Sequence, residues 1–245
     1  MLTPNERKRY DRQMMIDGFG EKGQERLKQA KVLVAGTGGL GSPVSFYLAA
    51  AGIGTLRVID CDVVELSNLN RQILHWTPDI GRKKVDSAEK KLRKLNPDIA
   101  IEAVCKTITI DNVFELSAGF DLIVDAMDNL PARFLLNRAA IARGIPFFHG
   151  AVSGLEGRVL TIIPGESACL RCLYRGPVRQ EKFPVVGVTP AVVGGIQAAE
   201  VIKFIVKTGR LLTNRLLVFD GLNLEFTEFK LRKNSACDHC GEPRP

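Results

Sequence analysis

The chain has 245 residues, 45% of them hydrophobic, a formal net charge of +7 and a pI near 9.2. This length favours one domain with a large core over two domains. The basic balance leaves two interpretations open, a solvated surface or attraction to an acidic protein partner. Aromatic residues are only 7% of the chain and are not interleaved with the basic clusters, which argues against a nucleic-acid partner.

No segment has the pattern of a membrane span or a signal peptide. The first residues, 1–15, lack an apolar core. The most apolar later run, 185–199, contains Thr189, Pro190 and Gln197, which do not suit a bilayer. We therefore expect a soluble, cytoplasmic protein with no membrane partner.

Residues 1–30 are predicted to form a helical arm, with the helix from residue 3 to residue 30. Thr3 can cap this helix, and Pro4 suits its first turn. The arm contains a dense polar cluster, 9–13, that includes Arg12. On sequence alone this cluster is typical of an exposed amphipathic helix.

The segment 31–62 is predicted to form a strand, a glycine turn, a helix and a second strand. The apolar run 32–35 is typical of a parallel strand that is covered on both faces. The spacing Gly36, Gly38 and Gly41 gives G-x-G-x-x-G, which lets a phosphate approach the N-terminus of the next helix. The second strand, 55–59, is followed by Asp60, which can bind ribose hydroxyls. A nucleotide site is therefore expected here.

Three polar residues follow in an irregular segment, namely Asn68, Arg71 and Gln72. The next helix is predicted from residue 82 to about residue 94, and Lys84 lies at its start. Two separated cations therefore follow the nucleotide motif, although lysines on a helix face are usually just solvated. A strand at 99–104 and a short helix at 111–118 come next.

The predicted strand 121–127 is buried and places Asp128 at its carboxyl end, where ligands bind in open α/β sheets. One interpretation is that Asp128 binds Mg²⁺, which prefers one or two carboxylates together with phosphate oxygens. The other is that Asp128 merely caps the helix 131–143. The residues alone leave both open.

The remaining chain is predicted to contain strands at 146–150 and 157–164, a long connection at 175–190 and a helix at 189–208. Strands 215–220 and 225–231 form a predicted hairpin. The expected fold class is therefore α/β: a doubly wound, mainly parallel, Rossmann-like sheet with antiparallel C-terminal strands. We expect one domain, with a nucleotide-binding core at 31–164 and a C-terminal part at 165–245.

Two C-x-x-C pairs predict one metal site made by Cys169, Cys172, Cys237 and Cys240. Four thiolates form a closed tetrahedral site for structural Zn²⁺, which would link the C-terminal tail to the main domain. The 64 residues between the pairs exceed the spacing of a compact zinc ribbon. A redox C-x-x-C, or His239 as a replacement ligand, stays open as an alternative.

Taken together, these motifs resemble the HesA/MoeB/ThiF family, the bacterial relatives of ubiquitin-activating enzymes. The resemblance extends over nearly the whole chain. The motifs that carry it are Arg12-Gln13, residues 36–41, 60–62, 67–72, 81–84 and 125–129, and the two C-x-x-C pairs.

The resemblance implies ATP as substrate and adenylation of the C-terminal glycine of a small ubiquitin-like sulfur-carrier protein ending in Gly-Gly. It implies a homodimer in which Arg12 reaches the partner's site, with Arg71 and Lys84 on phosphates, Asp128 on Mg²⁺ and the cysteines on zinc. The implied nucleotide-binding residues are Gly36, Gly38, Gly39, Gly41, Asp60, Asp62, Asn68 and Gln72. Such cations suit phosphoryl chemistry, in which charge builds on phosphate oxygens.

One departure concerns the connection after the first C-x-x-C pair. Members that form a covalent link with their carrier have a cysteine shortly before a Gly-Val pair, here Gly187-Val188, but 181–186 contains none. We therefore expect release of the acyl-adenylate to a separate persulfide-bearing sulfur donor. Competing hypotheses are a nicotinamide-dependent oxidoreductase and a family relative that acts on tRNA or as a non-catalytic scaffold.

Overall fold

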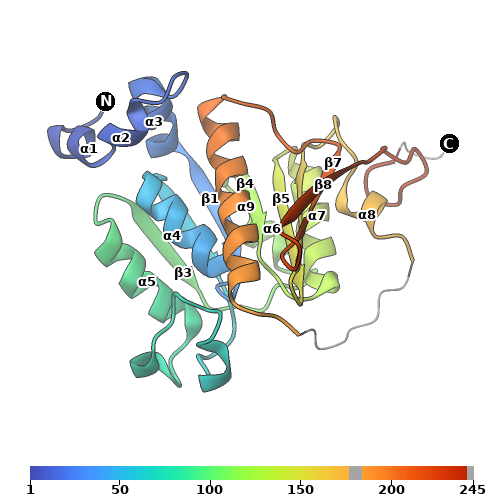
Figure 1. Cartoon of the computed structure of the whole chain (residues 1–245), viewed down its shortest axis with the longest axis horizontal. Helices are drawn as coiled ribbons and strands as arrows, with labels where there is room; N and C mark the ends of the chain where they lie inside the picture. The colour runs from blue at the N-terminus through green and yellow to red at the C-terminus, as the bar shows by residue number, and fades with distance from the viewer. Residues whose placement is uncertain (177–183, 242–245) are drawn as a thin grey trace.

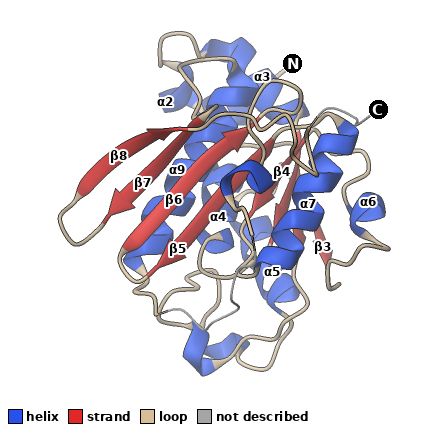
Figure 2. Ribbon diagram, turned by 90° about the vertical axis from the view of Figure 1, so that its right-hand side faces the viewer, coloured by secondary structure: helices blue, strands red, loops and turns tan. Residues whose placement is uncertain are grey.

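The computed structural model describes residues 1–176 and 184–241. Within these ranges the chain forms one sheet of eight strands in the order β3-β2-β1-β4-β5-β6-β7-β8 (Figures 1 and 2). The strands are β1 (Lys31–Ala35), β2 (Thr55–Ile59), β3 (Ala100–Val104), β4 (Leu122–Asp125), β5 (Phe147–Ser153), β6 (Glu156–Ile162), β7 (Arg215–Asp220) and β8 (Glu225–Lys230).

The sheet has a parallel and an antiparallel part, as the sequence predicts. Strands β3, β2, β1, β4 and β5 are parallel, and β6, β7 and β8 continue the sheet in antiparallel order. The strand order reverses between β1 and β4, the point at which ligands bind in doubly wound sheets. The expected fold class is therefore confirmed.

Helices cover both faces of the parallel part. The helices are α1 (Pro4–Arg9), α2 (Asp11–Met14), α3 (Gly20–Gln29), α4 (Gly41–Ala51), α5 (Lys84–Leu95), α6 (Val113–Leu116), α7 (Leu130–Arg143), α8 (Leu170–Leu173) and α9 (Val188–Val206). One core cluster joins Val32 and Val34 to α4, α5 and α9, which Figure 1 shows in front of the sheet. The other joins Leu33 and Ala35 to α6, α7 and α8. Alternate residues of β1 are thus buried on opposite faces.

Helix α9 is the one helix in the described chain with the length and apolar composition of a membrane span. Its fully buried residues include Val193 and Val201, and it packs on α4, β5 and β6. Packing in the core therefore accounts for its apolar composition.

The main local differences from the sequence predictions lie at element ends. The N-terminal arm is three helices rather than one, because the chain turns at Tyr10 and again at Gly18, which has φ 78°. The helix predicted from residue 82 begins at Lys84, and the one predicted at 111–118 contains only Val113–Leu116. These shifts leave the order of elements unchanged.

Candidate nucleotide-binding edge and cysteine cluster

The glycine turn connects β1 to α4 and leaves no room for side chains at two positions. Gly36 has φ 96°, and a Cβ there would lie 2.6 Å from the carbonyl oxygen of Ala126, at the end of β4. A Cβ on Gly41 would lie 1.9 Å from the oxygen of Gly36. The turn therefore packs directly on the end of β4 and leads into the N-terminus of α4, a helix end whose free N–H groups favour an anion.

Asp60, at the end of β2, shapes the same turn. Its Oδ2 accepts hydrogen bonds from the backbone N–H of Thr37 at 2.8 Å and from the Thr37 hydroxyl at 3.0 Å, and its Oδ1 accepts one from Asp62 N–H at 3.0 Å. Asp60, the residue predicted to bind ribose hydroxyls, thus also fixes the conformation of the glycine turn. A carboxylate oxygen has two lone pairs, so these bonds leave acceptor capacity for a ligand.

Lys84 is buried, at 5% exposure, as the first residue of α5. Its Nζ donates to Asp62 Oδ2 at 2.9 Å, and the Asp62 side chain is 61% exposed. A buried cation at the positive end of a helix dipole is unfavourable for stability, so Asp62 offsets part of this cost. The placement suits a lysine that meets an anionic ligand better than a solvated surface lysine.

Arg71 lies between the glycine turn and the start of α9. A Cβ on Gly39 would lie 3.8 Å from Arg71 Cγ, and one on Gly187 would lie 3.2 Å from Arg71 Cα. The guanidinium donates to the carbonyl of Ser67 at 2.9 Å and to Asn70 Oδ1 at 3.0 Å. These bonds hold Arg71 at this edge while leaving other N–H donors for a phosphate.

Asn68 and Gln72 are buried beside Arg71, at 7% and 5% exposure. Asn68 Oδ1 accepts from the N–H of Glu65 at 3.1 Å, and its Nδ2 donates only a long bond, 3.5 Å, to the Ser67 hydroxyl. Gln72 Oε1 accepts no hydrogen bond from any residue in the described parts of the chain, and its amide lies next to Gly38. A buried acceptor is costly without a donor, and a nucleotide could supply one through its hydroxyl or amino groups.

Asp128 lies just beyond β4 and is exposed. The cap of α7 is Asn129, whose Oδ1 accepts from the N–H of Ala132 at 3.0 Å. The interpretation of Asp128 as the helix cap is therefore wrong. The Asp128 carboxylate instead accepts only a long, 3.3 Å bond from Asn129 Nδ2 among the described contacts, which fits a group available to a metal ion.

Arg12 lies away from this edge. Its neighbour Gln13 donates to the carbonyl of Ala51, at the C-terminal end of α4, at 2.9 Å. The glycine turn is at the opposite end of this helix, which is about 16 Å long at 1.5 Å per residue. Arg12 is exposed and does not join the site of its own chain.

The four cysteines predicted to bind metal come together, with all their Sγ atoms within 4.8 Å of one another. Cys169 Sγ lies 4.0 Å from Cys172 Sγ and 3.7 Å from Cys237 Sγ, and Cys172 Sγ lies 3.5 Å from Cys240 Sγ. A tetrahedral site with Zn–S bonds of about 2.3 Å requires sulfur atoms about 3.8 Å apart. The cluster therefore fits zinc, and its sulfur separations do not correspond to disulfides.

Burial raises the pKa of the Cys169 thiol far above its usual range and that of the Cys240 thiol to about 11. Burial also opposes ionisation of Cys172, but the N–H groups of Asn234 and of its own turn lower the pKa of this thiol. A divalent cation is what would make four such groups ionise together.

His239 is not placed as a ligand of this cluster. Its Nδ1 meets Asn137 Nδ2 at 2.8 Å, and its ring packs edge-on against Phe134 of α7. The Oδ1 of the same Asn137 accepts from the N–H of Leu170, in the first C-x-x-C turn, at 3.0 Å. One buried asparagine of α7 thus contacts both cysteine turns, and Arg171 adds an ion pair to Asp238 between them.

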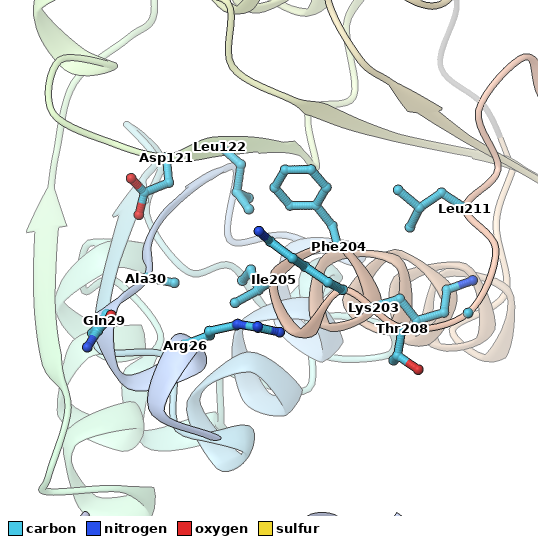
Figure 3. A pocket seen from close by; sticks show the side chains of 12 residues that line it. Arg26, Gln29, Ala30, Asp121, Leu122, Lys203, Phe204, Ile205, Thr208 and Leu211 are labelled. Carbon is cyan, nitrogen blue, oxygen red and sulfur yellow. The ribbon is translucent and has the colours of Figure 1, made fainter. Parts of the chain in front are cut away.

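A hollow of about 570 Å³ lies at the opposite edge of the sheet (Figure 3). Two of its cations donate to backbone carbonyls at and just after the end of α9. Arg26 donates to the carbonyl of Val206 at 2.7 Å, and Lys203 donates to that of Arg210 at 2.8 Å. It contains none of the predicted site residues, and three of its charged side chains, Arg26, Asp121 and Lys203, already have partners within the protein.

Sequence reasoning missed a buried polar group behind Asp128. Asp125 and His149 are both fully buried and are joined by a 2.6 Å hydrogen bond. Arg133 and Tyr174 flank this pair. Asp125 belongs to the motif 125–129, but nothing in the sequence indicates that His149, 24 positions further along the chain, and Tyr174, 25 positions beyond His149, would join it.

The model of the ThiF family matches residues 10–239. The chain belongs to the ThiF family. The match includes the glycine turn, Arg71, Lys84, Asp128 and all but the last of the four clustered cysteines. It confirms the family that the sequence motifs resemble.

Curated relatives are similar over almost the whole chain. A protein of Haloferax volcanii named "SAMP-activating enzyme E1" is 43% identical over 240 residues, which cover 96% of this chain and 88% of that protein. The "Sulfur carrier protein adenylyltransferase" of Thermus thermophilus is 42% identical over 251 residues, covering 98% and 93%. Crystal structures with the same fold include Escherichia coli MccB, at TM-score 0.86, 24% identity and coverage of 96% of this chain and 75% of that one.

Proposed function

We propose that this chain is an adenylyltransferase that uses ATP to activate the C-terminal glycine of a small ubiquitin-like sulfur-carrier protein, with release of pyrophosphate. The observation that carries the proposal is the arrangement of Arg71, Lys84 and Asp128 around one glycine turn at the carboxyl edge of the sheet. Family membership and the names of the two relatives support it.

The residues of this edge have separate tasks in the proposed reaction. The glycine turn and Asp60 hold the nucleotide, and Gln72 offers it a buried acceptor. Arg71 and Lys84 stabilise the charge that develops on the phosphate oxygens when the carrier carboxylate attacks the α-phosphorus. Asp128 holds Mg²⁺, which when bound neutralises charge on the phosphates. A hydride-transfer enzyme has no need of this set of groups, so the oxidoreductase hypothesis is set aside.

We further propose one Zn²⁺ at the four cysteines, a homodimer that brings Arg12 to the partner's site, and a separate persulfide protein as sulfur donor. Support for the zinc is the sulfur geometry. Support for the dimer is the distance of Arg12 from its own glycine turn. The segment without a cysteine, 181–186, lies partly outside the described residues, so the separate donor rests on the sequence. The cytoplasm is the proposed compartment, and 1–245 is proposed to be a single adenylation domain.

The experiment is pyrophosphate exchange into ATP, measured with purified protein, Mg²⁺ and a carrier that ends in Gly-Gly. The matched control is the same carrier without its last glycine. Exchange that requires the intact carrier supports the proposal. Exchange without any carrier, or none with carriers of several sulfur pathways, contradicts it.

A further inference from the structure

The turn that carries Asp128 is held by the buried carboxylate of Asp125. Asp125 Oδ1 accepts from the N–H of Met127 at 3.1 Å, which closes the turn immediately after β4. The glycine turn packs on the same residues, because Gly36 lies against the carbonyl of Ala126. A change in the orientation of Asp125 would therefore move both the Asp128 backbone and the residues on which the glycine turn packs.

Two further side chains fix Asp125 and its turn. His149 Nδ1 lies 2.6 Å from Asp125 Oδ2, and both residues are fully buried. Arg133 of α7 has its Nε 3.7 Å from the same oxygen and donates to the carbonyl of Met127 at 3.0 Å. The carboxylate thus has a cation nearby and a directional donor in His149.

His149 is itself oriented from its other nitrogen. Burial lowers the pKa of His149, against the attraction of Asp125, so the ring is neutral with the proton on Nδ1 toward the carboxylate. Its Nε2 then accepts, and the Tyr174 hydroxyl lies 3.4 Å away with the two rings edge to face. Tyr174 directly follows α8, which carries Cys172. A continuous set of contacts therefore joins the cysteine cluster to the Asp128 turn.

We propose that His149 is a positioning residue that, by orienting Asp125, holds the Asp128 turn in the geometry that binds the divalent cation of the ATP complex. Tyr174 keeps His149 in this orientation from the side of the cysteine cluster. The inference rests on the proposed role of Asp128 and concerns how that role is achieved. Removing partners of this kind typically costs ten- to a hundredfold in metal affinity.

The test compares His149→Leu, which lacks the donor, with His149→Asn, whose amide can donate from the position of Nδ1. The first readout is the electron paramagnetic resonance of Mn²⁺ titrated into protein with a non-hydrolysable ATP analogue. The second is the Mg²⁺ dependence of carrier-dependent exchange. We expect His149→Leu to weaken Mn²⁺ binding and raise the Mg²⁺ requirement of exchange about tenfold. His149→Asn should keep Mn²⁺ binding and the Mg²⁺ requirement close to those of the wild type. Tyr174→Phe should shift both in the same direction as His149→Leu, but less.

A control separates positioning from general loss of stability. Thr161→Val removes another buried hydrogen bond of the sheet, to Glu200 Oε2, outside the nucleotide-binding edge. It should lower the melting temperature without changing Mn²⁺ binding. If His149→Leu does not fold, His149→Phe replaces it, because its ring occupies similar space.

Two results would overturn the proposal: unchanged Mn²⁺ and Mg²⁺ titrations in a folded variant without the donor, or equal shifts in Thr161→Val. If the wild type exchanges normally in those cases, the proposed function stands while the inference fails. If the wild type shows no exchange, the adenylation proposal fails, and the Mn²⁺ titration alone still decides the role of His149.

Discussion

The nucleotide-binding edge and the cysteine cluster contrast in how their polar groups are used. At the edge, Gln72 Oε1 is unpaired within the described chain and Asp128 has one long bond. In the cluster the sulfur atoms face one another, and Asn137 uses both ends of its amide on the two cysteine turns. Groups with unused hydrogen-bonding capacity at the edge are suited to a substrate, whereas the groups of the cluster, which face one another and could share a metal ion, are suited to holding the chain together. Substitutions should therefore separate activity from stability.

The largest expected effect is loss of activity at the edge. Lys84→Ala and Arg71→Ala should each lower carrier-dependent exchange roughly a hundredfold or more, because each removes a charge that stabilises the phosphates. Loss of Lys84 leaves Asp62 exposed to water, so the fold should persist. Lys83→Ala, at the exposed neighbouring position, is the control and should exchange normally. Normal exchange by Lys84→Ala would remove this lysine from the mechanism.

Asp128 and Asn129 allow the contrast to be tested at adjacent positions. Asp128→Ala should abolish most exchange, with little change in melting temperature, because its carboxylate is exposed and does not cap α7. Asn129→Ala should instead lower stability by about 1 kcal/mol, the usual cost of losing an N-cap. Circular-dichroism melting and exchange at several Mg²⁺ concentrations measure both. Near-normal exchange by Asp128→Ala at low Mg²⁺ would contradict the metal-binding role.

In the cysteine cluster the main effect should be on stability. Elemental analysis of the wild type should find about one zinc per chain, and Cys172→Ser should lose it and unfold at lower temperature, since metal binding is coupled to folding. Cys61→Ser, at an exposed cysteine outside the cluster, is the matched control. Much less than one zinc in carefully prepared wild type would refute the site.

A smaller effect is expected from Asn137→Leu. This change removes the hydrogen bonds to Leu170 and His239 while keeping all four thiolates. Zinc should be released faster to a coloured chelator, followed by absorbance. Arg138→Ala, on the exposed side of the same helix, should release zinc at the wild-type rate. Equal rates in all three proteins would show that Asn137 does not hold the cysteine turns.

No covalent carrier adduct is expected at all. Outside the cluster the cysteines are Cys61 and Cys105, and neither lies in the connection after the first C-x-x-C pair, where members that form a covalent link with their carrier have a cysteine. Intact mass spectrometry of enzyme, carrier and Mg²⁺-ATP should therefore show a carrier–AMP species only. A thiol-sensitive adduct that disappears in Cys61→Ser or Cys105→Ser would contradict this.

The sequence predicted those parts of the fold and site that depend on local patterns. The glycine turn, the parallel strands and the two cysteine pairs have characteristic spacing, and the structure brings each together as expected. Whether Asp128 binds a metal ion or caps α7 could not be decided, because the adjacent Asn129 has a similar capping preference and the two residues differ only in side-chain direction. The contacts of Asp125 with His149 and of Asn137 with both cysteine turns depend on tertiary packing between distant segments, which no local pattern encodes.

The position of Lys84 implies a conflict between the stability of the fold and the proposed activity. A cation at the first position of α5 opposes the helix dipole, and its burial adds to the cost. Selection for heat resistance alone would replace it with a neutral or acidic residue, which would raise stability and, under the proposed function, remove activity. Engineering of a thermostable form should therefore keep Lys84 fixed and seek its gains elsewhere.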